Sequence, residues 1–170
     1  MYLFDVLRKA YYQFFLGFFR NLKFRFFGAK LGRNVKFYGK PFVMGYYTRL
    51  TIGDGCFINE GVVFNSRDDI TIGNDTHLSS YCKIYTGTID YNDWKTHLSA
   101  PVKIGNNCAI ASGAIVVGGV DICDDVIVAA GAVVTKSIDK PGLYAGNPAR
   151  FIRDFKGDNP DHYKEQRFNR

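Results

Sequence analysis

The chain has 170 residues, which is enough for one domain with a sizeable hydrophobic core. Hydrophobic residues make up 46% of it and charged residues 22%, a balance that excludes a disordered chain. The net charge of +6 is uneven, because residues 1–40 hold nine basic side chains and a single acidic one, Asp5. No uncharged apolar run of about 18 residues and no cleavable signal pattern is present, so we expect a cytoplasmic protein.

We assign residues 1–30 to an N-terminal segment that is aromatic and basic, with eight Phe and three Tyr by residue 28. The apolar spacing favours a helix from Tyr2 to about Phe19, with Gly17 as its weak point. Two interpretations remain open: the aromatic face packs on the rest of the protein or on a sister subunit, or residues 1–28 contact anionic lipid at the inner membrane surface. Nucleic-acid binding is not expected, because no RNA-recognition or helix-turn-helix pattern accompanies the charge.

An aliphatic residue returns every six positions between residues 104 and 138. The series runs Ile104, Ile110, Val116, Ile122, Val128 and Val134, and small or branched residues follow four places later at Cys108, Ala114, Val120, Val126 and Ala132. A period of six matches neither a helix nor an alternating strand, and it is typical of a parallel β-helix whose coils stack on one another. If three hexads make one coil, Ile104 and Ile122 stack in a ladder.

The repeat begins less regularly near Leu31, and it slips by two residues near Arg67 and Asp68. We therefore predict an all-β fold, a parallel β-helix over residues 31–140. Three cysteines stand four places after a repeat aliphatic, where a small buried side chain is needed: Cys56, Cys82 and Cys108. These are expected to be reduced and to pack as small hydrophobes. No metal site is expected, because there is no CxxC spacing and the three His residues are at least 20 positions apart.

The repeat has one large break, between Ile84 and Ile104, where the spacing is twenty residues instead of a multiple of six. We interpret residues 85–103 as a loop extruded from the coil, and functional residues often lie on loops held by a rigid scaffold. The loop contains the only Trp, one of the three His and two carboxylates, namely Trp94, His97, Asp90 and Asp93. Residues 141–170 leave the repeat and are expected to form a C-terminal cap and tail, with a short polar helix near Asp161–Asn169.

The hexads at 104–138, followed by PGLYAGNPARFI at 141–152, resemble the bacterial hexapeptide-repeat acyltransferases. TGTIDYNDW (86–94) and APVKIG (100–105) are similar to the branch of sugar O-acetyltransferases that act in surface-polysaccharide biosynthesis. The AGNPAR motif (145–150) makes the resemblance specific to this superfamily. The resemblance covers about 31–153, and it implies a left-handed parallel β-helix, a homotrimer, and acetyl transfer from acetyl-CoA at clefts between neighbouring subunits.

The resemblance also implies a CoA groove along the last coils. Backbone amides at small-residue corners are expected at Ser112, Gly113, Ala130 and Gly131, and phosphate contacts at Lys136 and Arg150, with Arg153 as a further candidate. Cations suit the phosphates of CoA because charge-assisted hydrogen bonds are the stronger ones. The alternative interpretation is coil packing for the small residues and solvated surface charge for the cations.

One position departs from that branch. After TG-[ST] the branch normally has a His followed by Asp or Asn, and this His takes the proton of the acceptor hydroxyl. The matching residues here are Ile89 and Asp90, and Ile cannot accept a proton. His97 is the candidate base, because an imidazole with a pKa near ~6.5 suits base catalysis at neutral pH. Asp90 with a raised pKa is an alternative, and a weak, inactive or purely CoA-binding trimeric relative is another.

We therefore predict an acetyltransferase that moves an acetyl group from acetyl-CoA to a sugar hydroxyl, on a sugar or a lipid-linked glycan. Asp90, Asn92 and Trp94 are expected to contact the sugar, with Trp94 either stacking on the ring or anchoring the loop. N-acetylation of an amino sugar is the alternative reaction, because an amino group needs less help from a base. His77 and His162 are expected to be structural or surface residues.

Overall fold

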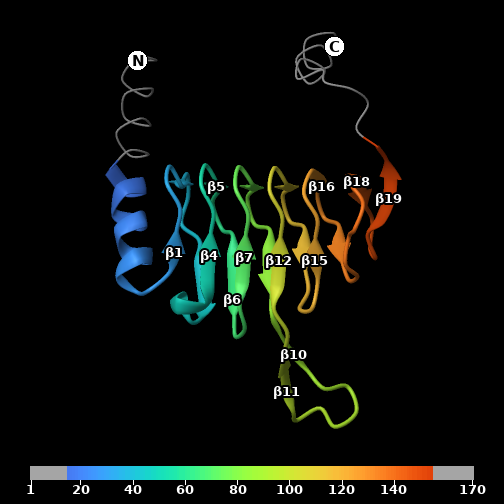
Figure 1. Cartoon of the computed structure of the whole chain (residues 1–170). Coiled ribbons are helices and arrows are strands. Elements are labelled where there is room, and N and C mark those ends of the chain that lie inside the picture. The colour runs from blue at the N-terminus through green and yellow to red at the C-terminus, as the bar shows by residue number, and fades with distance from the viewer. Residues whose placement is uncertain (1–14, 155–170) are drawn as a thin grey trace, which may run out of the picture.

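The computed structural model of the chain describes residues 15–154, and the fold is a parallel β-helix built from three sheets (Figure 1). Sheet A contains β1 (Lys30–Leu31), β4 (Leu50–Ile52), β7 (Ile70–Ile72), β12 (Val102–Ile104) and β15 (Asp121–Ile122). Sheet B contains β2 (Lys36–Phe37), β5 (Phe57–Ile58), β8 (His77–Leu78), β13 (Ala109–Ile110), β16 (Val126–Val128), β18 (Gly142–Ala145) and β19 (Arg150–Arg153). Sheet C contains β3 (Phe42–Gly45), β6 (Val63–Ser66), β9 (Lys83–Tyr85), β14 (Ile115–Val116) and β17 (Val133–Val134), and a short 3-10 helix, η1 (Tyr47–Arg49), joins β3 to β4. The predicted β-helix of hexapeptide repeats is confirmed.

The repeat aliphatics form ladders inside the coil, as the period of six predicts. Ile52 and Ile72 pair in register in sheet A, and Ile104 and Ile122 continue the same ladder. These four side chains are at most 3% exposed, so each coil adds one layer to a continuous core. Neighbouring strands of a sheet lie about 4.8 Å apart, and each coil therefore advances the β-helix by about that distance.

The cysteines pack in this core, as expected. Cys56, Cys82 and Cys108 are free thiols that are at most 2% exposed. Burial raises the pKa of the Cys82 thiol to about 12 and that of the Cys108 thiol to about 11. Because only the thiolate is nucleophilic, both residues are packing residues and not reactive groups at neutral pH.

Short polar side chains form hydrogen bonds between the successive turns that connect sheets A and B. Asn74 Oδ1 accepts a hydrogen bond from the Asp54 backbone N–H at 2.8 Å, and Asn106 Oδ1 accepts one from the Asn74 N–H at 2.8 Å. Asp124 Oδ1 accepts the next bond, from the Asn106 N–H at 2.7 Å, and this contact lowers the pKa of the Asp124 carboxyl. The turn of one coil is thus bonded to the turn of the next, which fixes the stacking.

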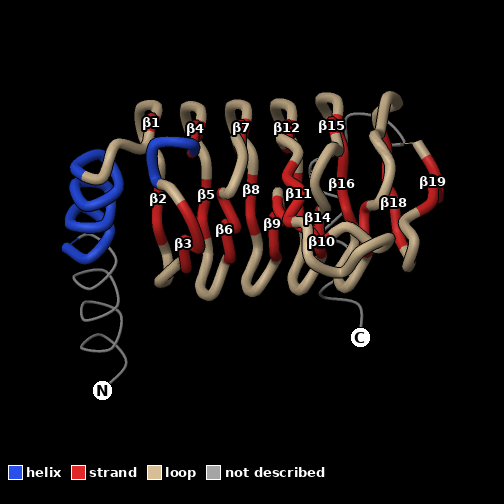
Figure 2. Tube along the Cα trace, turned by 90° about the horizontal axis from the view of Figure 1, so that it is seen from below, coloured by secondary structure: helices blue, strands red, loops and turns tan. Residues whose placement is uncertain are grey.

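A helix over residues 15–26 covers the first coil, at the end of the molecule opposite β19 (Figure 2). Its Phe24 is 3% exposed and packs on Phe37 and Tyr47, with ring centroids 4.8 and 5.0 Å away. Asn21 on the same face donates a hydrogen bond from Nδ2 to a carbonyl of the first coil at 2.9 Å. Within residues 15–154, no helix is long and apolar enough to cross a bilayer.

The helix continues past Phe19, where we expected its end. Gly17 has a low helix propensity, but Phe24, about two turns later, is anchored on the coil, and tertiary packing outweighs propensity in most helices. The expected start of the helix at Tyr2 lies outside the described residues.

Two strands, β18 and β19, follow residue 140. Ile138 forms a parallel bridge with Ile122 in sheet A, and β18 then pairs with β16 in sheet B. β19 folds back antiparallel on β18 and ends the described chain at the far end of the coil. The polar helix expected near Asp161–Asn169 lies outside the described residues.

Candidate active site

The 85–103 insertion is a β-hairpin. β10 (Gly87–Ile89) pairs antiparallel with β11 (His97–Ser99), and the hairpin projects sideways from the coil between sheets C and A (Figure 1). The sequence led us to expect a loop extruded from the coil, and two short strands within it form a ladder. Residues of the hairpin therefore have defined partners across the strands.

The hairpin register places His97 directly opposite Ile89. Asp90 N–H donates to the Thr96 carbonyl at 2.8 Å and Ala100 N–H donates to the Thr86 carbonyl at 2.9 Å, so these pairs are hydrogen-bonded. Because the two kinds of pair alternate in an antiparallel ladder, Ile89 and His97 form a non-hydrogen-bonded pair. The side chains of such a pair share one face of the ladder, with Cβ atoms about 5 Å apart. The His97 side chain therefore lies beside residue 89, the position that the resemblance assigns to the catalytic His.

The two carboxylates of the hairpin stabilise its turn. Asp90 Oδ1 accepts hydrogen bonds from the backbone N–H of Asn92 at 2.8 Å and from its Nδ2 at 2.9 Å. Asp93 accepts a bond from the Thr96 hydroxyl and bonds of 2.8 Å from the N–H groups of Thr96 and Lys95, and these bonds lower the pKa of its carboxyl. Asp90 is therefore bonded to Asn92 and to no His within the part of the chain that the structure describes.

An exposed aromatic pair lies at the hairpin tip. Trp94 is 72% exposed and Tyr91 is 74% exposed, and their rings meet edge to face with centroids 5.9 Å apart. Trp94 has a φ of 60°, a backbone conformation that is unusual for a bulky residue. Trp94 was predicted from the sequence to contact the sugar, whereas Tyr91 was not, although Tyr91 lies only three residues before the Trp.

A pocket of about 490 Å³ lies at the corner between sheets C and A, on the N-terminal side of the hairpin, and it is lined by Met44, Gly45, Tyr46, Asn65 and Arg67. Asn65 Oδ1 is buried and has no hydrogen-bond partner among the described residues. Gly87 at the start of β10 packs so closely on Arg67 that an added Cβ would lie 2.6 Å from its Cδ. The slip of the repeat near Arg67 was the one sign of this pocket in the sequence, and it did not lead us to predict the pocket.

The small residues expected in the CoA groove stack at the corner between sheets B and C. Ser112 and Gly113 lie between β13 and β14, Ala130 and Gly131 lie between β16 and β17, and Gly131 N–H donates to the Ser112 carbonyl at 3.0 Å. Gly113 N–H donates in turn to a carbonyl of the preceding coil at 3.1 Å, so both glycine amides are already used. Both glycines have a φ of 69° and no atom within 4 Å of an added Cβ, so the corner is open. We name these four residues the donor corner.

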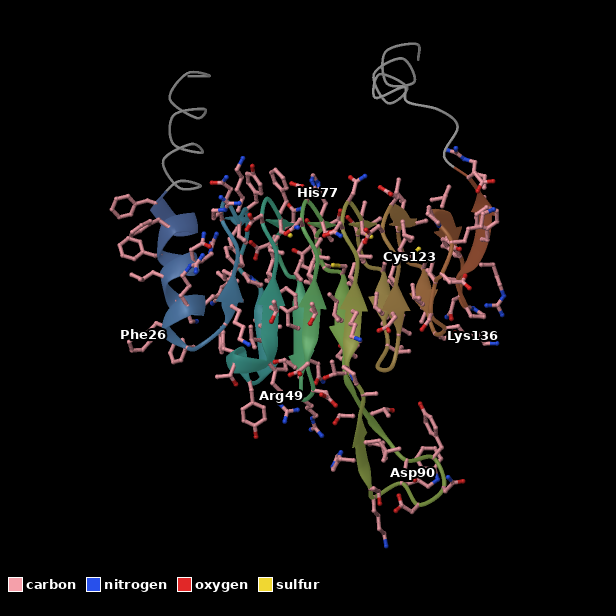
Figure 3. All side chains as sticks on the ribbon, in the orientation of Figure 1. Phe26, Arg49, His77, Asp90, Cys123 and Lys136 are labelled. Carbon is pink, nitrogen blue, oxygen red and sulfur yellow. The ribbon has the colours of Figure 1, made fainter. Side chains whose placement is uncertain are left out.

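The two cations expected to bind phosphates are exposed. Lys136 follows β17 on the corner between sheets C and A (Figure 3). Arg150 begins β19. Arg150 Nη1 donates to the carbonyl of Ala149 at 3.0 Å. Neither cation has a carboxylate partner within residues 15–154, so both charges are available to an anion.

A single chain does not bring the hairpin and the donor corner together. The donor corner precedes β14, whereas the hairpin follows β9, and these two strands are parallel neighbours in sheet C. The two groups therefore lie at opposite ends of the strands of sheet C. His77 lies elsewhere, on the outer face of sheet B, 4.3 Å from the Phe57 ring, and His162 lies outside the described residues. The described ranges contain no cluster of three or more His, Cys, Asp or Glu suited to a metal ion.

Comparison with known proteins gives the same family as the motifs. Residues 101–136 match the family described as bacterial transferase hexapeptide (six repeats). A relative from Escherichia coli (strain K12), named as a proposed colanic acid biosynthesis acetyltransferase, WcaF, is 34% identical over 137 residues, which cover 79% of this chain and 74% of the relative.

Two solved structures have the same fold. The maltose O-acetyltransferase from Clostridium difficile 630 is 29% identical, with a TM-score of 0.75 over 81% of this chain and 75% of that one. The hexapeptide-repeat acetyltransferase VCA0836 from Vibrio cholerae, in complex with acetyl coenzyme A, is 27% identical, with a TM-score of 0.73 over 81% of this chain and 77% of that one. The resemblance carried by the hexads and AGNPAR is confirmed, and the chain belongs to the hexapeptide-repeat acetyltransferases.

Proposed function

We propose that this protein transfers the acetyl group of acetyl-CoA to a hydroxyl of a sugar in a cell-surface glycan. The relatives support this reaction, because one is named for colanic acid biosynthesis, one for O-acetylation of maltose, and one was solved with acetyl-CoA. The exposed Lys136 and Arg150 and the open donor corner suit the phosphates and the narrow arm of such a donor.

The observation that carries the proposal is the pairing of His97 with Ile89 across the hairpin. An acetyl transfer to a hydroxyl needs a base where the hydroxyl lies, and Ile89 cannot be that base. His97 is exposed on the same face of the ladder, so its imidazole can occupy the space that a His at position 89 would occupy. The catalytic base has thus moved to the neighbouring strand.

The reaction then proceeds by direct transfer in a ternary complex. The imidazole of His97 takes the proton of the sugar hydroxyl as the oxygen attacks the thioester carbonyl carbon. The tetrahedral intermediate collapses, the carbon–sulfur bond breaks, and the thiolate of CoA takes the proton back from the imidazolium. The backbone N–H groups of Ser112 and Ala130 donate to no other described group, so they are available to the oxyanion.

The hairpin tip supplies the contacts to the acceptor. Trp94 and Tyr91 expose apolar ring faces on which a sugar ring can stack, and each keeps a polar edge. Asp90 has one carboxylate oxygen engaged with Asn92, and the second oxygen is available to a sugar hydroxyl. We assign Asp90, Asn92 and Trp94 to acceptor binding and His97 to proton transfer.

The outward faces of the coil support a homotrimer. Sheet A presents a polar row of side chains: Lys30, Thr51, Thr71, Lys103 and Asp121. The corresponding rows of the other two sheets are mainly apolar. Sheet B presents Phe57, Ala109, Ile127 and Leu143, interrupted by Lys36 and His77, and sheet C presents Val63, Ile115 and Val133, interrupted by Lys83. Two different apolar faces suit a closed ring in which sheet B of one copy meets sheet C of the next.

Such a ring also completes the site. The hairpin and the donor corner lie at opposite ends of sheet C within one chain, so a neighbouring copy has to supply one of them. Ile127→Asp places a charge in the middle of sheet B and is expected to yield monomers in light scattering, without transfer activity. Monomers from the unchanged protein, active at high dilution, would contradict the ring.

We also propose peripheral contact with the inner membrane surface through residues 1–28, where lipid-linked glycans are within reach. Residues 6–53 contain no Asp or Glu, so this end of the molecule attracts anionic lipid. Flotation of the full-length protein with anionic vesicles tests the contact. Protein that remains at the bottom of the gradient with every lipid composition contradicts it.

The transfer itself is tested by following CoA thiol release from acetyl-CoA with a panel of sugar acceptors. His97→Gln is expected to lower kcat by about 10²–10⁴-fold, the range for loss of a general base. Thr71→Ala is the control, because Thr71 is exposed in the polar row of sheet A, outside both faces of the proposed ring. Unchanged turnover in His97→Gln would overturn the role of His97, and acetyl-CoA binding without thiol release for any acceptor would overturn the transfer.

A further inference from the structure

We infer that the outward face of the N-terminal helix docks on an anionic lipid bilayer and that the coil stands end-on to the membrane. The inference rests on the proposed peripheral contact and adds the residues that insert and the orientation of the enzyme. We name the side chains Phe18, Phe19, Leu22 and Phe26 the helix outer face.

The helix outer face is apolar and points away from the core. Its four side chains are 63%, 50%, 54% and 82% exposed, in chain order. At 3.6 residues per turn they lie on the side of the helix opposite Gly17 and Phe24, which face the first coil and are buried. A helix on the end of a globular domain normally exposes polar side chains on that side. The pattern here is reversed, which is typical of a helix that lies in a membrane interface.

Cations border the helix outer face on both sides. Lys23 lies along one edge and Arg25 along the other, and both are exposed. Arg25 Nη2 donates to the carbonyl of Gly32 at 2.7 Å, so its charge is not neutralised, and Lys23 has no ion-pair partner among the described residues. An apolar stripe between two lines of positive charge matches acyl chains flanked by anionic headgroups.

The same charges argue against a second copy of the chain as the occupant. Two helix outer faces packed together would bring Lys23 and Arg25 of one copy near those of the other, and residues 6–53 hold no carboxylate to compensate them. Like charges at an interface oppose association. An anionic bilayer buries the same apolar side chains and neutralises the cations.

The position of the helix sets the orientation of docking. The helix lies across the end of the row of coils, with its axis roughly perpendicular to that row (Figure 1), and Phe26 points away from the coil (Figure 3). Insertion of the helix outer face therefore sets the axis of the coil roughly along the membrane normal. In the proposed ring, copies turned about an axis parallel to the coil present three such helices to one plane, and their contributions to binding multiply.

End-on docking places the hairpin near the membrane without inserting it. The hairpin leaves the coil after β9, the third strand of sheet C, which lies two strand spacings of about 4.8 Å, or about 10 Å, beyond β3. The pocket lined by Asn65 and Arg67 lies between the helix and the hairpin along the same row. A glycan whose lipid remains in the bilayer can therefore reach His97, and the acceptor class that fits is a membrane-anchored glycan.

Tryptophan fluorescence tests the orientation, because the chain has a single Trp at the hairpin tip. Phe26→Trp adds a second reporter on the helix outer face. With vesicles of equal parts phosphatidylglycerol and phosphatidylcholine, brominated on the acyl chains, the Trp at position 26 is expected to shift to the blue and be quenched. Trp94 in the unchanged protein is expected to do neither. Quenching of Trp94 would overturn end-on docking.

Matched serine variants test the residues. The single variants Leu22→Ser and Phe26→Ser are each expected to weaken binding to these vesicles by about tenfold or more, because each removes apolar area that the bilayer would bury. Ile152→Ser at the opposite end of the coil is the control, because Ile152 and Leu22 are equally exposed, at 54%. The rate of acetyl transfer to a sugar in solution is expected to be unchanged in Leu22→Ser, Phe26→Ser and Ile152→Ser.

The outcomes separate the two proposals. If the unchanged protein floats but the serine variants float equally well, the helix outer face is not the contact, while peripheral binding through another part stands. If the unchanged protein does not float with any of the vesicles, both the peripheral contact and docking through the helix outer face are wrong. Equal binding to vesicles of phosphatidylcholine alone would overturn the selection for anionic lipid.

Discussion

The coil and the hairpin that projects from it are held together by different forces. Every repeat aliphatic from Ile104 to Val134 is at most 3% exposed, so the coil is stabilised by a continuous core. Residues 91–99 of the hairpin are all exposed, and its order comes from the strand ladder and the turn bonds of Asp90 and Asp93. Side chains in the hairpin can therefore change without loss of the fold, which is compatible with the proposed shift of the base from position 89 to His97 on the opposite strand.

An exchange across the hairpin tests this difference most strongly. His97→Ile is expected to lower kcat by about 10²–10⁴-fold. Ile89→His in the same chain is expected to restore the rate to within about tenfold of the original, because paired positions share one face of the ladder. Initial rates of thiol release measure both, with circular dichroism as the control for folding. A double variant that is folded and as inactive as His97→Ile would show that the two positions are not equivalent.

Truncation of one side chain in each region compares their stability. Ile110→Ala in the coil is expected to cost about 2–5 kcal/mol of the free energy of unfolding, because it leaves a cavity at a fully buried position. Leu98→Ala in the hairpin is expected to change it by less than about 0.5 kcal/mol, since Leu98 is 45% exposed. Urea unfolding followed by circular dichroism measures both. Equal losses would contradict the division into a packed coil and a surface hairpin.

The hairpin tip offers a smaller test of acceptor binding. Trp94→Asn keeps a residue that tolerates a positive φ, so stability is expected to change by less than about 0.5 kcal/mol. The KM for the sugar is expected to rise about fivefold or more, with kcat nearly unchanged, if the indole stacks on the acceptor. Tyr91→Ser is the companion variant with the same expected direction. An unchanged KM in both would limit the aromatic pair to holding the turn.

The smallest effect concerns pH. The pKa of Asp93 is lowered by its bonds to Thr96 and Lys95, so the ionised carboxylate stabilises the hairpin turn. A lowered pKa gives stabilisation that is complete above the ordinary value of about 3.9 and is lost as the pH falls through the lower folded value. The protection of the Lys95 and Thr96 amides, measured as the exchange rate relative to the intrinsic rate at the same pH, is expected to be constant near neutral pH and to fall below about pH 4. Asp93→Asn is expected to remove that acid step, and a step that persists would assign it to another carboxyl.

Much of the coil could be predicted because its pattern of buried residues repeats over a short distance along the sequence. The period of six predicts that Ile104 and Ile122 are buried. The burial of Cys108 follows from its position four residues after Ile104, without knowing which residues it contacts. The donor corner was predicted by family motifs, but the use of the Gly113 and Gly131 amides by neighbouring coils was not visible, because those bonds join residues of different coils.

The candidate site was harder to predict. The sequence pointed to the insertion and to His97 as candidates, yet the separation along the chain could not show that a residue eight positions after Ile89 lies opposite it. That placement depends on the register of the hairpin strands. A shift of one residue would place the His97 side chain on the opposite face of the ladder. The pocket of Asn65 and Arg67 was missed for the same reason, since its walls come from strands about twenty residues apart.

By itself the sequence determined the β-helix, its hexads, its single insertion and the family, because each of these is recorded in short-range spacing and motif. Only the tertiary structure decided which side chains meet across strands and which faces remain uncovered. His97 lies beside Ile89 because the hairpin closes in one register, and Phe26 faces outward because Phe24 anchors the opposite side of the helix on the coil. Both outcomes follow from contacts between distant segments, which no local pattern in the chain contains.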